Sequence, residues 1–137
     1  MTNCIFCKII NGNIPSYKVY EDEQVLAFLD ISQTTKGHTL VIPKSHAKNF
    51  AECDDNDLNK VMSVAKKIAN SLLKTGAKGV NILSNINEVA GQSVFHFHVH
   101  VIPRYNENDT IKISFVNNNE KYKDEMQNIA TLIKNNL

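Results

Sequence analysis

The sequence predicts an α+β fold: a five-stranded antiparallel sheet with one main helix packed on it, a short N-terminal helix and a C-terminal helix. Three observations support this class. Several short stretches are rich in β-branched and aromatic residues, which is typical of strands. One long stretch repeats its apolar residues every three or four positions, as an amphipathic helix does. The elements follow in the order hairpin, strand, helix, two strands and helix, which favours an antiparallel sheet with one main helix on a face.

The strands are predicted from apolar segments that turn residues separate. The first two form a hairpin around Asp22-Glu23-Gln24, and Pro43 closes the third, which is almost continuously apolar. A polar loop over residues 85–91 precedes the last and longest strand. The predicted strands cover residues 18–21, 25–29, 39–43, 79–84 and 94–102.

The main helix is predicted to begin at Asp54 or Asp55, either of which can cap its first turn. Gly76 follows its last periodic residues and suits the left-handed backbone that ends many helices. A short helix is predicted over residues 4–11. Apolar residues at helical spacing predict a further helix over residues 122–133 that closes the chain.

The composition indicates one ordinary globular domain over residues 1–137. The chain carries 15 Lys+Arg against 14 Asp+Glu, a formal charge of +1, and 42% of its residues are hydrophobic. This balance argues against a nucleic-acid-binding protein, because such affinity depends on many Lys and Arg contacts to phosphate. No stretch resembles a signal peptide or a membrane span, and three cysteines suit a reducing compartment. We therefore expect a cytoplasmic protein without a membrane partner.

Three histidines alternate with apolar residues in the last predicted strand. Side chains on a strand alternate between its faces, so His96, His98 and His100 are predicted to project together. Three imidazoles on one face of an apolar strand cost too much desolvation to be merely structural. The residues predicted to project oppositely, into a core, are Phe95, Phe97, Val99 and Val101.

Two chemistries compete for this row of histidines. Alternate residues lie roughly 6.6 to 7 Å apart along a strand, so two imidazoles could bind one zinc ion, but three cannot easily converge. Alternatively, a neutral imidazole is a nucleophile and a general acid or base at neutral pH. The loop upstream brings neutral donors that suit a phosphate, and no Walker-type loop is present. These donors come from Asn85, Gly91, Gln92 and Ser93.

The run from His96 to Ile102 resembles the signature of the histidine triad superfamily, in which histidines alternate with hydrophobic residues. Nearly the whole chain resembles the Hint-like branch of that superfamily, over roughly residues 4 to 105. The further segments that carry the resemblance are CIFCKI at 4–9, AFLDI at 27–31, GHTLVIPKSH at 37–46 and AGQS at 90–93.

The resemblance implies hydrolysis of the P–N bond in purine nucleoside 5′-phosphoramidates of the AMP-amine or AMP-lysine type. His98 would be the nucleophile that forms a nucleotidyl-histidine intermediate, from which water releases the nucleoside monophosphate. His38 would orient His98 from a neighbouring strand, and Ser93 would also lie near the leaving group. The catalytic residues that the resemblance implies are His98, His100, His38 and Ser93.

A nucleotide site is implied in the same way. Asp30 would accept hydrogen bonds from ribose hydroxyls while apolar side chains face the base, so that a purine of either kind is tolerated. The implied nucleotide-binding residues are Phe28, Asp30, Ile31, Asn85, Gly91, Gln92, Ser93, His98 and His100.

The pair Cys4 and Cys7 is a modest zinc signal by itself. Some Hint-like proteins carry a Cys2His2 zinc site, and His46 and His96 supply two further ligands under that resemblance. Four protein ligands would make the zinc structural, and the chemistry would need no cofactor.

The family further implies a homodimer in which two sheets join into one ten-stranded sheet. Three other functions stay open: hydrolysis of diadenosine polyphosphates, as in relatives that usually carry glutamine at the position of Ser93; a nucleotide-binding adaptor with vestigial activity; and a zinc hydrolase that uses the histidine row itself. The chain departs from the family at residues 86–89, where many relatives carry glycine, and matches less closely from Asn106 onward.

Overall fold

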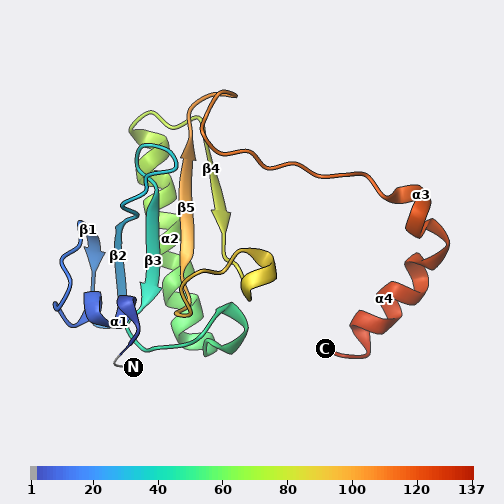
Figure 1. Ribbon diagram of the computed structural model, residues 1–137, viewed down its shortest axis with the longest axis horizontal. Helices are drawn as coiled ribbons and strands as arrows, with labels where there is room; N and C mark the ends of the chain where they lie inside the picture. Colours follow the sequence, from blue (N-terminus) through green and yellow to red (C-terminus); the bar gives the residue numbers. More distant parts are fainter. Residues whose placement is uncertain (1–2) are drawn as a thin grey trace.

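The computed structural model describes residues 3–137 and confirms the α+β class with a five-stranded antiparallel sheet (Figure 1). The strand order is β1-β2-β3-β5-β4, so β1 and β4 form the two edges. The strands are β1 (Lys18–Glu21), β2 (Val25–Leu29), β3 (Thr39–Pro43), β4 (Gly79–Leu83) and β5 (Val99–Arg104).

One long helix and several short ones accompany the sheet. No helix of the described residues combines the length and apolar character needed to cross a membrane. The α-helices are α1 (Ile5–Ile10), α2 (Asp55–Lys74), α3 (Asn119–Tyr122) and α4 (Met126–Lys134). The 3-10 turns are η1 (Phe50–Glu52), η2 (Glu88–Ala90) and η3 (Lys123–Glu125).

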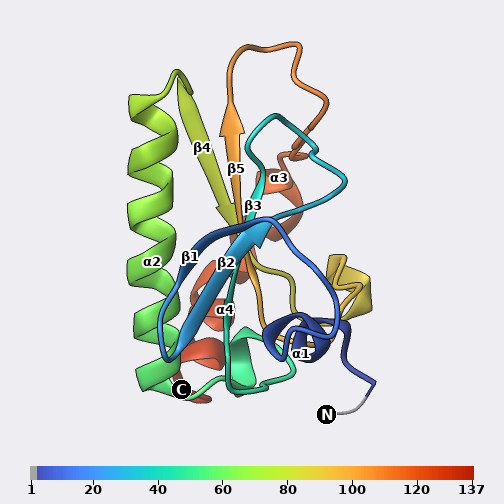
Figure 2. The same cartoon turned by 90° about the vertical axis from the view of Figure 1, so that its left-hand side faces the viewer.

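The helices α2 and α1 lie on opposite faces of the sheet (Figure 2). Consecutive side chains of β2 and β3 alternate between the two resulting clusters, which is why these strands are apolar at nearly every position. The cluster under α2 comprises Val25, Ala27, Val41, Cys53, Val61, Val64, Ala65, Ile68, Phe97, Val99 and Val101. The cluster under α1 comprises Phe6, Ile9, Leu26, Phe28, Leu40 and Ile42.

Local polar contacts explain where the main elements begin and end. The carboxylate of Asp22 accepts the backbone N–H groups of Gln24 at 2.7 Å and Val25 at 2.8 Å, which closes the β1–β2 hairpin. Asp54 caps α2 by accepting from the backbone of Asp57, as the sequence predicts. Gly76 has φ +121°, which confirms its predicted left-handed role after α2.

The fifth strand is shorter at its start than the sequence predicts. It begins at Val99 instead of Val94, and it continues to Arg104. The preceding segment is held by a loop: the backbone N–H of Phe97 donates to the carbonyl of Ala47 at 2.7 Å. Because this N–H bonds outside the sheet, the strand pairing starts two residues later.

The histidine row is therefore only partly on a strand. His96 and His98 lie in the irregular segment before β5, and only His100 belongs to it. Phe95, predicted to enter the core, is 37% exposed, whereas Phe97 is fully buried under α2.

The C-terminal segment also differs from the prediction. The sequence predicts one closing helix, but the structure has α3, η3 and α4 in succession, joined to β5 by an extended connection. Figure 1 shows this segment standing away from the domain on the far side of β4. Every residue from Lys112 to Leu137 is exposed, so the helix closes nothing within this chain.

Candidate active site and metal centre

The three imidazoles lie on the face of the sheet that α1 covers. The ring of Phe6 in α1 meets His96 and His98 edge to face, with centroids 5.9 and 5.2 Å apart. The rings of His98 and His100 lie 5.0 Å apart. Phe97 packs on the opposite side, under α2. The predicted alternation thus holds for these residues even though the segment is not yet a paired strand.

His98 has a defined tautomer. Its Nδ1 lies 2.7 Å from the backbone carbonyl of His96, and a carbonyl only accepts, so the proton of a neutral ring is on Nδ1 and the lone pair is on Nε2. Burial lowers the pKa of His98, although the hydrogen bond to the His96 carbonyl and the charge of Asp30 oppose this. The ring is therefore neutral at pH 7, the form in which an imidazole is a nucleophile.

His38 contacts His100, which corrects the expectation that it orients His98. Its Nε2 lies 2.9 Å from Nδ1 of His100. His38 stands two positions before Leu40, the partner of His100 across the β3–β5 pair, so its side chain lies on the same face. His38 is 3% exposed, and burial lowers its pKa.

The contact assigns the proton of His100 as well. The backbone N–H of Thr34 donates to Nδ1 of His38 at 3.4 Å, so the His38 proton is on Nε2 and is donated to Nδ1 of His100. The His100 proton is then on its own Nε2. Burial, reinforced by His98 and His38, lowers the pKa of His100 to about 4, so the ring is neutral. His98 presents a lone pair and its neighbour His100 presents a donor.

Asp30 lies at the end of β2 beside these rings. Its Oδ1 accepts the backbone N–H of Ser32 at 2.8 Å and the Ser32 hydroxyl at 2.6 Å, and its Oδ2 lies 3.7 Å from Nε2 of His38. Burial alone would raise the pKa of Asp30, but the Ser32 hydrogen bonds and the nearby imidazoles hold it below its ordinary value. Asp30 is ionised, and Oδ2 is the oxygen left for further donors.

The loop between β4 and β5 turns at Gly91, whose φ is +98°. A Cβ at this position would lie 3.3 Å from Nδ2 of Asn85, and that same amide donates to the Gly91 carbonyl at 3.3 Å. Asn87 also has positive φ, at +71°, so this loop reaches its shape without a glycine at that position. Asn85 is half-buried and Gly91 is exposed.

Gln92 is placed differently from the expectation that it binds the nucleotide. It is 3% exposed, and its Nε2 donates to the carbonyls of Lys48 at 2.7 Å and Val94 at 3.1 Å. Its Oε1 accepts the backbone N–H of Asn87 at 2.8 Å. The side-chain amide is fully used inside the protein, so Gln92 shapes the loop instead of contacting a ligand with its side chain.

An apolar cavity of about 250 Å³ opens between α1 and the end of β2. It brings together three residues of the predicted nucleoside site, Phe28, Asp30 and Ile31. The remaining wall is mostly aliphatic and includes Ile5, Phe6, Ile9, Ile14 and Leu40. Phe28 is buried and meets Phe6 edge to face at 5.5 Å, whereas Ile31 is 89% exposed at the mouth.

The four predicted metal ligands, Cys4, Cys7, His46 and His96, converge beside α1, with all ligand atoms within 4.8 Å of one another. The Nδ1 atoms of the two histidines are 3.1 Å apart. The Cys7 Sγ lies 3.4 Å from Nδ1 of His46 and 3.6 Å from Nδ1 of His96, and the Cys4 Sγ lies 3.5 Å from the latter.

These separations fit a tetrahedral zinc ion. Bonds of about 2.0–2.1 Å to nitrogen and about 2.3 Å to sulfur place ligand atoms about 3.3 Å apart for two nitrogens and about 3.6 Å apart for nitrogen and sulfur. The Nε2 of His96 is 2.8 Å from the carbonyl of Pro43, so the ring proton points away from the four residues and the Nδ1 lone pair points toward them.

Asp30, His38 and His100 form a second group, in which one oxygen or nitrogen atom of each side chain lies within 4.8 Å of the others.

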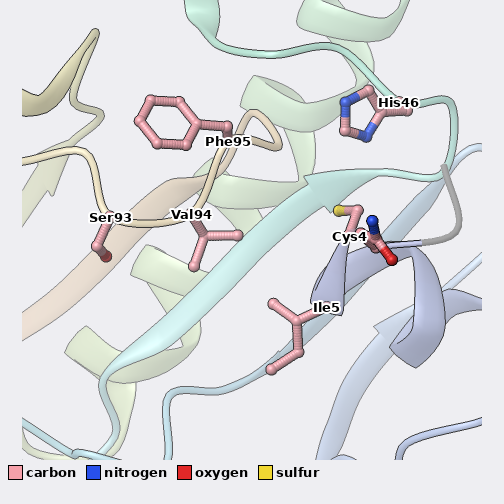
Figure 3. Close-up of a pocket in the computed structure, with 7 residues that line it drawn as sticks. Cys4, Ile5, His46, Ser93, Val94 and Phe95 are labelled. Atoms are coloured by element: carbon pink, nitrogen blue, oxygen red, sulfur yellow. The ribbon is translucent and has the colours of Figure 1, made fainter.

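A larger cavity, of about 490 Å³, lies between two of the predicted metal ligands, Cys4 and His46, and the loop before β5. Figure 3 shows Ser93, Val94 and Phe95 on one side of it and Cys4 and His46 on the other. Ser93 is exposed there, and no hydrogen bond joins it to another side chain within residues 3–137. Val94 lines both this cavity and the apolar one.

Three residues that support the site were not predicted from the sequence. Gln33 donates from Nε2 to the carbonyls of Asp30 at 2.6 Å and His38 at 2.8 Å, and so holds the loop that positions both. The hydroxyl of Ser84 donates to the carbonyl of His98 at 2.7 Å, and the ring of Phe6 packs edge to face against the imidazole of His98. The sequence carries a local signal only at the turn after Asp30, because a serine two positions after an aspartate is typical of a turn that the aspartate side chain closes.

Comparison with known proteins agrees with this geometry. The model of the HIT domain matches residues 11–107. The chain belongs to the HIT domain family. The Protein hit of Bacillus subtilis is 52% identical over 137 residues, covering 98% of this chain and 94% of that one. A crystal structure of a HIT family member from the same species superposes with a TM-score of 0.93 at 51% identity, covering 98% and 97% of the two chains.

More distant members of the HIT family carry names that state an activity or a metal. The adenosine 5′-monophosphoramidase of Schizosaccharomyces pombe is 44% identical over 105 residues, 77% of each chain. An adenylylsulfatase of Arabidopsis thaliana is 41% identical over 103 residues, 74% of this chain and 52% of that one. A zinc-bound histidine triad family protein of Mycobacterium smegmatis superposes with a TM-score of 0.76 at 34% identity, covering 97% of each chain.

Proposed function

We propose that this HIT family protein is a hydrolase of purine nucleoside 5′-phosphoramidates, of the AMP-amine or AMP-lysine type, that uses His98 as a covalent nucleophile. The observation that carries the proposal is the proton assignment of His98. Its Nδ1–H is held by the His96 carbonyl at 2.7 Å, so a neutral ring offers the Nε2 lone pair to an electrophile. The name of the Schizosaccharomyces pombe relative supports this substrate class.

The reaction has two displacements at phosphorus. First, Nε2 of His98 attacks the α-phosphorus, a P–Nε2 bond forms and the P–N bond to the amine breaks, while the amine takes up a proton supplied by solvent. Ser93 is the proposed relay for that proton, and the His98 ring, which keeps its Nδ1–H, becomes cationic. Water then attacks the same phosphorus and gives up a proton to solvent, the P–Nε2 bond breaks, and the nucleoside monophosphate leaves with His98 restored to its neutral form.

Donors around the phosphate would stabilise the charge that develops on its oxygens. The Nε2–H of His100 is one such donor, because His38 occupies the other ring nitrogen at 2.9 Å. The backbone of Gly91 and the amide of Asn85 are further candidates on the loop before β5. Preorganised donors of this kind accelerate a reaction because they bind the transition state more tightly than the substrate.

The nucleoside would occupy the apolar cavity next to Asp30. Oδ2 of Asp30 is the oxygen available to ribose hydroxyls, since Oδ1 already accepts two bonds from Ser32. Phe28 and Ile31 would contact the base. An aliphatic wall with few polar atoms binds a planar ring without reading its edge, so we propose that adenine and guanine are both accepted.

We further propose a structural zinc ion at Cys4, Cys7, His46 and His96. The ligand separations fit the tetrahedral geometry, and a zinc-bound family member supports it. Zinc with four protein ligands stabilises a fold and leaves no open position for a substrate. Here the four ligands would join α1 to the loop after β3 and to the segment before β5.

A homodimer completes the proposal. β4 is an edge strand with unpaired backbone groups on one side, and such edges are covered by other elements or by another chain. Pairing of two β4 edges would give a ten-stranded sheet.

The second candidate activity is cleavage of an adenylyl sulfate, which the name of the Arabidopsis relative favours. This reaction would use the same His98 intermediate with a different leaving group.

The test compares His98→Ala with Lys66→Ala, an exposed position on α2, using adenosine 5′-phosphoramidate and chromatographic detection of AMP. We expect the His98 variant to lose turnover by at least 1,000-fold, because removing a catalytic nucleophile can cost up to about 10⁶-fold in kcat. Its melting temperature is expected to stay at the wild-type value, and the control is expected to keep wild-type rates. Acid-labile radioactivity retained by quenched wild-type enzyme after labelling at the α-phosphate would support the intermediate. Unchanged turnover in His98→Ala would overturn the proposal.

A further inference from the structure

The connection between α1 and β1 carries a buried hydroxyl that the proposed function leaves unexplained. The Oγ of Ser16 is buried and has no hydrogen-bond partner within residues 3–137. No other buried or half-buried residue in that range has a buried side-chain oxygen or nitrogen atom without a partner. Such atoms are rare in folded proteins, because burial removes their hydrogen bonds to water. The hydroxyl of Ser16 therefore requires an explanation outside the fold itself.

The backbone on both sides of Ser16 is anchored. Two residues earlier, the N–H of Ile14 donates to the carbonyl of Lys8 in α1 at 3.3 Å. One residue later, the carbonyl of Tyr17 accepts the N–H of Leu29 in β2 at 2.9 Å. Ser16 is therefore held between α1 and the sheet, and a small backbone adjustment cannot bring its hydroxyl to another partner.

Ser16 lines the apolar cavity of about 250 Å³ that is proposed to hold the nucleoside. Among the described residues that line this cavity, only Ser16 and Asp30 have polar side chains. All the other lining side chains are aliphatic, aromatic or proline. A molecule inside the cavity can therefore form side-chain hydrogen bonds to these two residues alone.

The two polar side chains differ in the groups that they can bind. Asp30 is ionised, so its Oδ2 only accepts hydrogen bonds, which suits the hydroxyls of a ribose. The hydroxyl of Ser16 can both donate and accept. The ring nitrogens of a purine and the keto oxygen of guanine accept hydrogen bonds, whereas the amino group of adenine donates them. One rotating hydroxyl can therefore pair with either purine.

We infer that the hydroxyl of Ser16 binds the polar edge of the purine base. The inference rests on the proposed function, which places the nucleoside in this cavity. The histidines and the loop before β5 are proposed for the phosphate and Asp30 for the ribose, so the heteroatoms of the base are the polar atoms that still need a partner. The hydrogen bond adds affinity for adenine and guanine alike, and it distinguishes both from a ring of the same shape without heteroatoms.

The experiment compares Ser16→Ala with Ser63→Ala, a matched change at an exposed serine of α2, by isothermal titration calorimetry of the full-length chain. The ligands are AMP, GMP and the 5′-monophosphate of indole riboside, whose base keeps the size of a purine but has no heteroatom on its edge. We expect Ser16→Ala to raise the Kd of AMP and of GMP by about three- to tenfold, as the loss of one neutral hydrogen bond does. The Kd of the indole nucleotide is expected to stay within about twofold of its wild-type value, because this ligand has no group to pair with the hydroxyl. Ser63→Ala is expected to bind all three ligands as the wild type does.

Thermal unfolding without ligand separates a hydroxyl that binds a ligand from one that supports the fold. Ser16→Ala removes a buried polar atom that has no partner, so its melting temperature is expected to equal or exceed that of the wild type, with zinc at equal excess in both proteins. A lower melting temperature would assign the hydroxyl to the fold and overturn the inference.

The other binding outcomes decide separate claims. An equal loss of affinity for all three ligands would place the hydroxyl at the ribose or the phosphate, and unchanged Kd values for AMP and GMP would show that it binds neither base. Both results overturn the inference and leave the proposed activity standing. A wild-type protein that binds none of the three nucleotides overturns the nucleoside site together with the inference. Hydrolysis of adenosine 5′-phosphoramidate by the same preparations is scored separately through His98, so the failure of Ser16 and the failure of the proposed activity remain distinct.

Discussion

Replacing Gln92 tests whether a residue expected to bind the nucleotide instead maintains the catalytic loop. In Gln92→Met the volume is nearly kept, but three hydrogen bonds are lost, to the backbone of Lys48, Val94 and Asn87. Each lost bond leaves a partly buried backbone group without that partner, which costs about 1 kcal/mol. We expect the free energy of unfolding to fall by about 3 kcal/mol.

The measurement is urea unfolding followed by circular dichroism, with zinc at equal excess in both proteins. A loss of about 3 kcal/mol corresponds to a decrease of roughly 10 °C in the melting temperature of a domain this size. The matched control is Gln24→Met, because Gln24 is exposed and its amide donates to the exposed side chain of Asn56 at 3.2 Å. The control is expected to stay within about 0.5 kcal/mol of the wild type.

Kinetics then separate a supporting residue from a binding one. Below the unfolding transition, Gln92→Met is expected to lower kcat, because Gly91 and Ser93 on either side lose their fixed positions. If Gln92 only bound the substrate, its replacement would instead raise KM and leave the free energy of unfolding unchanged. Wild-type stability together with a raised KM would refute the role assigned to the Gln92 amide.

Three further outcomes follow from the site. Burial lowers the pKa of His100 to about 4, so the folded state binds this proton less readily than the unfolded chain, and the free energy of unfolding should decrease as pH falls from 6.5 to 4. Urea unfolding of His100→Asn should show a shallower dependence of this free energy on pH. The same dependence in the variant and the wild type would exclude His100 as its cause. Removing zinc by chelation should lower the free energy of unfolding by about 4 kcal/mol relative to free zinc at 1,000 times its Kd. In calorimetry, this difference should vanish in Cys7→Ala and persist in Cys53→Ala. The same difference in both variants would place the ion elsewhere. Gly91→Ala should lose about 1–2 kcal/mol of stability and most of its phosphoramidase activity, since φ is +98° and a Cβ would lie 3.3 Å from Asn85; unchanged melting and turnover would contradict the strain.

The sequence predicted the fold well where a single periodicity governs a segment. The alternation in β2 and β3 and the helical spacing of α2 follow directly from which faces are buried. The start of β5 was predicted wrongly, because alternation alone cannot reveal that Phe97 bonds to the carbonyl of Ala47. The C-terminal helix was expected to close the domain, since an apolar stripe indicates burial but not the chain that provides it.

The site was predictable in its membership more than in its contacts. The four predicted metal ligands converge as the resemblance implies, and Phe28, Asp30 and Ile31 share one cavity. The partner of His38 and the role of Gln92 depended on distances between separate loops, which no local pattern carries. Both corrections come from hydrogen-bond geometry that exists only after folding.

His96 has a consequence that extends beyond either site alone. Its Nδ1 faces the two cysteines, while its backbone carbonyl holds the proton of His98. One residue is thus shared by the proposed metal centre and the proposed nucleophile, and a shift of its backbone would move both. Thermodynamic reciprocity then applies: whatever factor a resident ion contributes to nucleotide affinity, bound nucleotide must return to the affinity for the ion.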